Sequence, residues 1–179
     1  MFLFLFCLLC YFSFVIELYI QDVFNQYILI YRKLFIMKIV VLKFGGTSVG
    51  TIKKIKKVAD IIEIYKRKNY KVIVVSSAMS GVTNELVKKS REISQNFSEE
   101  EYDVLVSSGE QVACALIAGR LIHKGLKSRS WLAWQIPMLT EGSHKNSRIN
   151  HINKNNILKY LKEGGVPIIT GFQGINKKK

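Results

Sequence analysis

Proline is scarce in this sequence, with two residues among 179, and the chain shows no internal repeat. Proline-rich linkers between domains are therefore excluded. Cysteine is scarce as well, with three residues, so the sequence indicates no disulfide framework and favours a reducing cytosol. The length suits one sizeable domain and no more.

The three cysteines give little sign of chemistry. Cys7 and Cys10 have C-x-x-C spacing, but a lone pair offers no second half for a zinc site. Cys114 lies within a helical pattern, which favours a small buried hydrophobe over a nucleophile. We therefore expect no protein-bound metal.

Acidic residues are few: 13 Asp and Glu stand against 27 Lys and Arg, giving a net charge of +14. Residues 1–36 carry no net charge, so the excess belongs to residues 37–179. A basic domain can bind nucleic acid, but few aromatics are interleaved with the lysines and no nucleic-acid motif is present. A solvated helix face is the favoured interpretation of one lysine cluster, and no nucleic acid is expected as a partner. The cluster consists of Lys53, Lys54, Lys56 and Lys57.

Residues 1–36 differ from the rest in being strongly apolar. The run from Met1 to Ile16 is shorter than the about 20 residues that cross a bilayer. It has neither the basic start nor the small-residue cleavage site of a signal peptide. Three interpretations stay open: a membrane anchor, an extra packed helix, or upstream sequence translated from a misassigned start, which is favoured.

The segment "KIVVLKFGGTSVG" begins with four apolar residues, Ile39–Leu42, as expected of a strand buried on both faces. Polar and small residues follow this apolar run directly. Lys43 brings a charge, Gly45 and Gly46 allow unusual dihedrals and close approach of N–H groups to an anion, and hydroxyls follow at Thr47 and Ser48. In parallel α/β sheets this edge borders the ligand crevice.

An amphipathic helix is predicted after the glycines, from the spacing of Ile52, Ile55, Ala59 and Ile62. Its amino terminus would face the glycine loop, so strand, loop and helix together suggest a phosphate site. A tight turn with a solvated lysine is the alternative. The P-loop pattern fails, because Thr51 stands where its lysine belongs, and the spacing does not fit a dinucleotide fingerprint.

Strands and helices alternate along the rest of the chain. Strands are predicted at "KVIVVSS" and near residues 128–133 and 166–170, with helices near residues 83–94 and 153–163. The capping-box spacings of Ser98 with Glu101 and of Ser108 with Gln111 predict a helix that restarts at "SGEQ". This alternation predicts an α/β fold, a three-layer αβα sandwich with a mostly parallel central sheet.

The motifs, taken together, resemble those of the aspartokinases, members of the amino acid kinase superfamily. "KFGGTSV" resembles the opening signature, "VVSSAMSGVTNEL" the second loop, and "SSGEQVACALIAGRL" the S-x-G-E helix. "SWLAWQIPMLTEGSHKNSRI" and "GVPIITGFQGIN" continue the resemblance, which covers the chain from Met37 to Asn176. An aspartokinase would begin near Met37, which favours the misassigned start.

The resemblance implies phosphoryl transfer from ATP, with Mg²⁺, to the side-chain carboxylate of L-aspartate, the first step of lysine, threonine and methionine biosynthesis. It assigns catalysis to Lys43 and binding of the ATP phosphates to Lys43 and the five residues after it: Phe44, Gly45, Gly46, Thr47 and Ser48. Thr83 and Glu110 would bind aspartate. From the residues alone, Thr83 could equally be a helix N-cap, and Glu110 an ordinary acid in a helix's first turn.

The resemblance also implies a cytoplasmic homo-oligomer. No association with a membrane is expected unless residues 1–36 are part of the protein. His144 and Trp134 match family positions without an assigned role. The sequence departs from the family by ending at "INKKK", before a T-L-G-R-G-G-S-D type motif and the regulatory ACT domains. We therefore expect a fold incomplete at the carboxyl terminus. Competing interpretations are another superfamily member and a noncatalytic fragment or membrane-tethered binding module.

Overall fold

A computed structural model describes residue 21, residues 38–142 and residues 146–176 of the chain. Lys38–Lys179 form one compact unit. The predictions for the apolar leader, Cys7 and Cys10, and the matched position of His144, lie outside the described residues.

Four strands form a fully parallel sheet in the order β1-β2-β6-β3. They are β1 (Ile39–Phe44), β2 (Lys71–Ser76), β6 (Val166–Thr170) and β3 (Ser128–Trp131). The predicted α/β fold with a mostly parallel sheet is thus confirmed. β1 lies at one edge, where Ile39 and Val41 stay 43% and 59% exposed.

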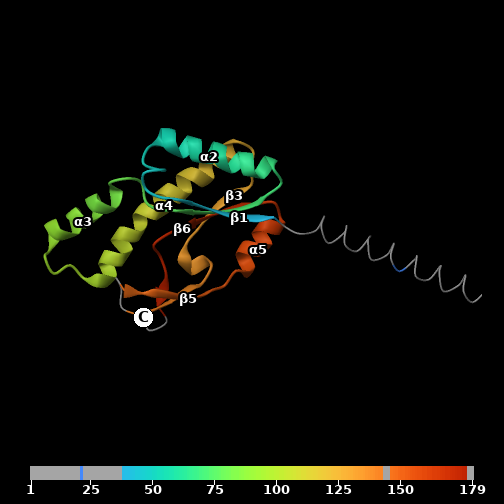
Figure 1. Cartoon of the computed structure of the whole chain (residues 1–179). Coiled ribbons are helices and arrows are strands. Elements are labelled where there is room, and N and C mark those ends of the chain that lie inside the picture. Colours follow the sequence, from blue (N-terminus) through green and yellow to red (C-terminus); the bar gives the residue numbers. More distant parts are fainter. Residues whose placement is uncertain (1–20, 22–37, 143–145, 177–179) are drawn as a thin grey trace, which may run out of the picture. The chain divides into compact units, whose positions relative to one another are not determined.

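Helices cover both faces of this sheet (Figure 1). On one face, α2 (Ile52–Arg67) and α4 (Glu99–His123) pack against alternate residues of β2, Val72 and Val74. On the other face, α5 (Asn155–Lys162) packs with Ile73 and Val75. The side chains of a strand alternate between faces, so β2 joins the two cores of the predicted αβα sandwich.

A second sheet was not predicted from the sequence. It consists of β4 (Met138–Glu141), β5 (Arg148–Ile152) and β7 (Ile175–Asn176), in the order β5-β4-β7. β5 runs antiparallel and β7 parallel to β4. A short 3₁₀ helix, η1 (Ala133–Gln135), connects β3 to this sheet. All five β5 residues are exposed, so their side chains contribute little to a core.

α4 is one continuous helix, so the predicted restart at Ser108 is wrong. The Ser108 hydroxyl donates to the Leu105 carbonyl at 2.7 Å, an internal helix bond that leaves it no capping role. Ser98 does hold the N-cap position, but its hydroxyl donates to the Glu100 carboxylate instead of capping the backbone. The capping box predicted with Glu101 is therefore absent.

α3 (Val82–Ile93) packs beside the first half of α4. A Cβ built on Gly109 would lie 3.2 Å from a Val82 methyl and 3.0 Å from the Ala78 Cβ. A glycine at this point of α4 therefore lets the second loop and the start of α3 approach the helix closely.

Candidate active site at the carboxyl ends of the parallel strands

The carboxyl ends of β1, β2 and β6 are tied to one another by backbone hydrogen bonds. The N–H of Ser77 donates to the Phe44 carbonyl at 3.0 Å, and the N–H of Gly171 donates to the Ser76 carbonyl at 2.9 Å. The loops that follow these three strands therefore start side by side. This is the edge where ligands bind in open parallel sheets.

The loop after β1 folds back on itself. The N–H of Ser48 donates to the Gly45 carbonyl at 2.9 Å, and the fully buried Val49 side chain anchors the loop in the core. Among residues 38–142 and 146–176, no backbone carbonyl accepts from the N–H of Gly46 or Thr47. These groups are the donors that an anion would use.

Two of the glycines serve loop packing. A Cβ on Gly46 would lie 3.1 Å from the Ala78 carbonyl oxygen, and one on Gly50 would lie 2.9 Å from the Ser80 Cβ. The first and second loops therefore approach each other only because side chains are absent here. Neither Gly45 nor Gly46 has a positive φ, so the loop does not use the unusual dihedrals that glycine allows.

α2 starts directly at this loop. The Thr51 hydroxyl caps it by accepting from the N–H of Lys54 at 3.2 Å, and the Lys54 ammonium donates to the Thr47 carbonyl at 2.8 Å. The first turn contains no acidic residue, so no side chain opposes the positive end of the helix dipole. The other three lysines of the predicted cluster are exposed, as expected of a solvated face.

Lys43 lies on the exposed side of β1, in line with Ile39 and Val41. Within the described residues, no hydrogen bond or ion pair joins it to Thr83 or Glu110. Phe44 points the other way and packs against the core, so any contact with phosphate would use its backbone. Thr47 and Ser48 are exposed and could each offer a hydroxyl.

Thr83 lies in the first turn of α3, following the second loop. The N-cap is Gly81, which has a φ of +84° and so adopts the left-handed conformation that glycine tolerates best. The alternative interpretation of Thr83 as an N-cap is therefore wrong. Thr83 is half-buried and its neighbour Asn84 is exposed, so Thr83 is the better placed of the two to contact a ligand between the loops.

Glu110 is buried in the middle of α4, only 4% exposed, which rules out the ordinary first-turn position. Its Oε1 accepts from the N–H of Ala78, in the second loop, at 3.2 Å. Its Oε2 is buried with no hydrogen-bond partner among the described residues. Burial raises the pKa of the Glu110 carboxyl. A buried carboxylate with one unpaired oxygen is suited to receive a cationic group.

Cys114 lies one turn beyond Glu110 on the same helix and is completely buried. Burial, with a smaller contribution from the Glu110 carboxylate, raises the pKa of the Cys114 thiol to about 12. A thiol with this pKa stays protonated at neutral pH, so it is unreactive, as expected from its place in the helical pattern.

Gln173 also contacts this edge of the sheet, a role that the sequence patterns did not predict. Its side chain accepts from the Thr170 hydroxyl at 2.9 Å and donates to the Ser107 carbonyl of α4 at 3.0 Å. The preceding Phe172 has a φ of +55° and is 80% exposed. Only the "GFQG" match pointed to this loop. Gln173 therefore fixes the loop after β6 to the helix that carries Glu110.

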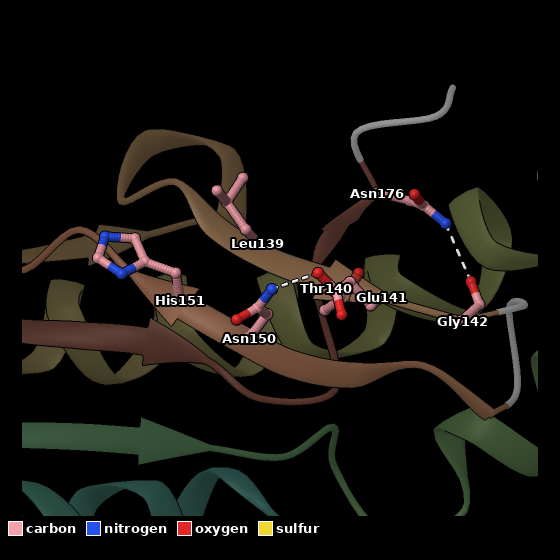
Figure 2. A pocket seen from close by; sticks show the side chains of 7 residues that line it. All are labelled: Leu139, Thr140, Glu141, Gly142, Asn150, His151 and Asn176. Atoms are coloured by element: carbon pink, nitrogen blue, oxygen red, sulfur yellow. Dashed lines mark hydrogen bonds between the residues drawn. The ribbon is translucent and has the colours of Figure 1, made fainter.

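A separate pocket of about 600 Å³ lies on the second sheet (Figure 2). Asn150 hydrogen-bonds to Glu141, and the Asn176 amide donates to the Gly142 carbonyl at 3.0 Å. None of the predicted site residues lines this pocket. Its lining consists of Leu139, Thr140, Glu141, Gly142, Asn150, His151 and Asn176.

The sequence and the fold of this chain are similar to those of known proteins. Residues 38–179 match the model of the amino acid kinase family. An aspartokinase of Rickettsia conorii is 49% identical over 144 residues, which cover 79% of this chain and 36% of the relative. An aspartokinase of Geobacillus stearothermophilus is 45% identical over 141 residues, covering 79% and 35%. The chain therefore spans about a third of the length of these relatives.

Solved structures agree with the fold. The aspartate kinase from Synechocystis aligns with a TM-score of 0.62 at 35% identity, covering 76% of this chain and 22% of that one. E. coli aspartokinase III in complex with aspartate and ADP aligns with a TM-score of 0.65 at 23% identity, covering 78% and 42%. Because the family model matches residues 38–179, this chain belongs to the amino acid kinase family.

Proposed function

We propose that this chain carries the phosphate loop and the aspartate side of an aspartate kinase, which phosphorylates the side-chain carboxylate of L-aspartate. Two aspartokinases, at 49% and 45% identity, favour this activity over others in the family. The observation that carries the proposal is the unpaired, buried Oε2 of Glu110 beside the second loop. The substrate's ammonium group would pair with it, and Thr83 would add a hydroxyl.

The reaction needs no general base in this proposal, because the aspartate carboxylate is already ionised near neutral pH. Catalysis would rest on aligning the two substrates and on neutralising the charge of the transferred phosphoryl group. Lys43 and the N–H groups of Gly46 and Thr47 would supply that neutralisation, with Phe44, Gly45 and Ser48 completing the loop.

ATP would enter as its Mg²⁺ complex, with the metal held by the phosphates. The described residues contain no group of three or more His, Cys, Asp or Glu side chains that could hold a metal ion. We further propose that 4-phospho-L-aspartate feeds lysine, threonine and methionine synthesis in the cytoplasm, by a homo-oligomeric enzyme.

Calorimetric titration of the full chain with L-aspartate tests the proposal. We expect binding by the wild type and at least a tenfold loss in Glu110→Gln, because an amide offers no charge to the ammonium group. Glu85→Gln is the matched control: Glu85 is exposed on α3 and pairs with Lys89, so its variant should bind normally. Equal affinity in Glu110→Gln would contradict the role of Glu110.

Titration with MgATP separates the two substrate sites. Binding of aspartate without ATP would identify a chain that holds the amino acid side alone, and binding of neither would favour the noncatalytic alternative. If the chain turns over, Lys43→Ala should lower the rate about 10²- to 10³-fold, as removal of one electrostatic group commonly does. Lys56→Ala, an exposed lysine of α2, is the control and should keep the wild-type rate.

A further inference from the structure

Lysines and isoleucines share the outward face of α2, on the outside of the fold (Figure 1). We define the α2 stripe as five exposed residues of this face: Lys53, Lys57, Ile61, Ile64 and the C-cap Lys68. Successive members are three or four residues apart, so all five lie within about a quarter of the helix circumference. The residues that α2 buries in the core lie on the opposite side.

The positive charge of this face is not neutralised within the fold. Residues 52–68 contain seven basic residues against two acidic ones. Both acids already have basic partners: Asp60 pairs with Lys124 at 2.7 Å, and Glu63 pairs with Lys124 at 2.7 Å and with Arg67 at 2.6 Å. Within the part of the chain that the structure describes, no ion pair joins a lysine of the α2 stripe to an acid.

Ile61 and Ile64 lie between these lysines and are 41% and 50% exposed. A purely solvated helix face gains nothing from them, because isoleucine leaves apolar surface in water and is a weaker helix former than lysine or glutamate. The tyrosines of this region, Tyr65 and Tyr70, pack against the core, so the stripe offers no aromatic ring on which a nucleic-acid base could stack. Cationic and aliphatic side chains on one surface suit a phospholipid bilayer instead, where anionic headgroups lie above acyl chains.

We propose that the α2 stripe docks this chain on an anionic phospholipid membrane. The lysine ammonium groups would lie at the headgroup phosphates, and the two isoleucines at the boundary of the acyl chains. The stripe is about 22 Å long from Lys53 to Lys68, at about 1.5 Å per residue, so it can contact more than one headgroup. Lys54 and Lys56 flank it, which brings the cluster into the range of about four to eight basic residues that is typical of helices that bind anionic lipid.

The fold supplies what the lysine cluster alone does not show. The sequence predicts a solvated face at the start of the helix, whereas the structure places Ile61, Ile64 and Lys68 on that same face. Two isoleucines bury little area, so this docking is reversible and depends on charge. The inference does not depend on the proposed activity, which uses the loops after β1 and β2.

Sedimentation of the full chain with lipid vesicles tests the proposal. We expect binding to vesicles of phosphatidylcholine mixed with phosphatidylglycerol, weak binding to phosphatidylcholine alone, and release at high salt, which screens surface charge. Each lysine near an anionic surface raises the binding constant about fivefold, so the double variant Lys57→Glu, Lys68→Glu should lose at least about 25-fold. The control is Lys159→Glu with Lys162→Glu, an equal charge change on α5, across the sheet, which should bind like the wild type.

A second variant tests the contact with acyl chains. Ile64→Ala should weaken vesicle binding about three- to tenfold, because it removes apolar surface from the lipid. Ile93→Ala is its control, since Ile93 is 79% exposed at the end of α3, outside the stripe. Circular dichroism checks that each variant folds, and aspartate titration of the same samples reports separately on the proposed function.

Three results would overturn the proposal. Equal binding to neutral and anionic vesicles would mean that charge does not drive the contact. Undiminished binding by the double lysine variant would assign the contact to another part of the chain, such as residues 1–36, which carry no net charge. Release from vesicles by an RNA oligonucleotide, together with unchanged vesicle binding by Ile64→Ala, would identify a general polyanion site instead of a membrane surface.

Discussion

The two sheets of this fold differ in what holds them together. All five residues of β6 are buried between helices and neighbouring strands, whereas all five residues of β5 are exposed. The parallel sheet is stabilised by side chains that leave water, and the second sheet mainly by its backbone hydrogen bonds. Equivalent substitutions should therefore have very different effects in the two sheets.

The largest effect is expected for an isoleucine pair. Ile168→Ala, on β6 and fully buried, should lower the free energy of unfolding by about 2–5 kcal/mol, because it removes packed volume from the core. Ile152→Ala, on β5 and 43% exposed, should lower it by less than about 1 kcal/mol. Urea denaturation followed by tryptophan fluorescence measures both. Similar losses would show that the second sheet has a core of its own.

The same difference explains which strands the sequence predicts. "VIVV" in β2 and "VPII" in β6 are continuous apolar runs, because both faces of those strands are covered. The sequences "MLTE" of β4 and "RINHI" of β5 mix polar and apolar residues without a clean period of two. Their pairing also has an irregular register between Leu139 and Thr140. Backbone pairing at a surface leaves almost no trace in side-chain pattern, so these strands were missed.

Glu110 should give the next largest effect, of opposite sign. Glu110→Gln removes a buried charge whose Oε2 is unpaired, so without ligand it should raise the free energy of unfolding at neutral pH by about 1–3 kcal/mol. Thermal denaturation should show this as a rise in Tm of several degrees. A fall in stability would mean that the carboxylate has a partner in the folded chain.

The pH dependence follows from the raised pKa of Glu110. The folded state holds this proton more tightly than the unfolded state. The charge therefore costs nothing below the unfolded pKa, and its cost grows as the pH rises through the folded pKa. The stability gain of Glu110→Gln should thus shrink toward zero on acidification. A gain that stays constant with pH would indicate a packing effect instead.

Glu110 also shows why the site was only partly predictable. The motif pointed to the residue, but it did not predict that Oε1 accepts a hydrogen bond from the N–H of Ala78, 32 positions earlier in the chain. Gln173 was missed because its partners, Thr170 and Ser107, lie on different elements, and the Ser107 contact spans 66 positions. Contacts of this range follow from the fold and have no local pattern.

A smaller effect is expected at the start of α2. Thr51→Ala removes the hydroxyl that caps α2 beside the loop after β1, and should lower the free energy of unfolding by about 1 kcal/mol. Ser98→Ala is the matched control, because the Ser98 hydroxyl occupies the N-cap position of α4 without capping the backbone. Its loss should be a few tenths of a kcal/mol. Equal losses in the two variants would show that the Thr51 hydroxyl stabilises its helix no more than the Ser98 hydroxyl does.

The smallest effect is expected in the second sheet. His151 is exposed on β5 and lines the pocket there, so His151→Ala should change the free energy of unfolding by no more than about 0.5 kcal/mol. Chemical denaturation of His151→Ala, with Ile152→Ala measured beside it, checks this expectation. A loss of more than about 1 kcal/mol in the free energy of unfolding would mean that the residues of this pocket help to stabilise the fold.

The position of β6 has a consequence for biosynthesis. This strand lies between β2 and β3 in the sheet but follows both in the sequence by at least 35 residues. While the ribosome is still making residues 166–170, β2 and β3 have no strand between them to pair with. Until β6 has left the exit tunnel, β2 is paired with β1 alone and β3 has no partner in the sheet, so both strands keep an open edge exposed to chaperones and proteases.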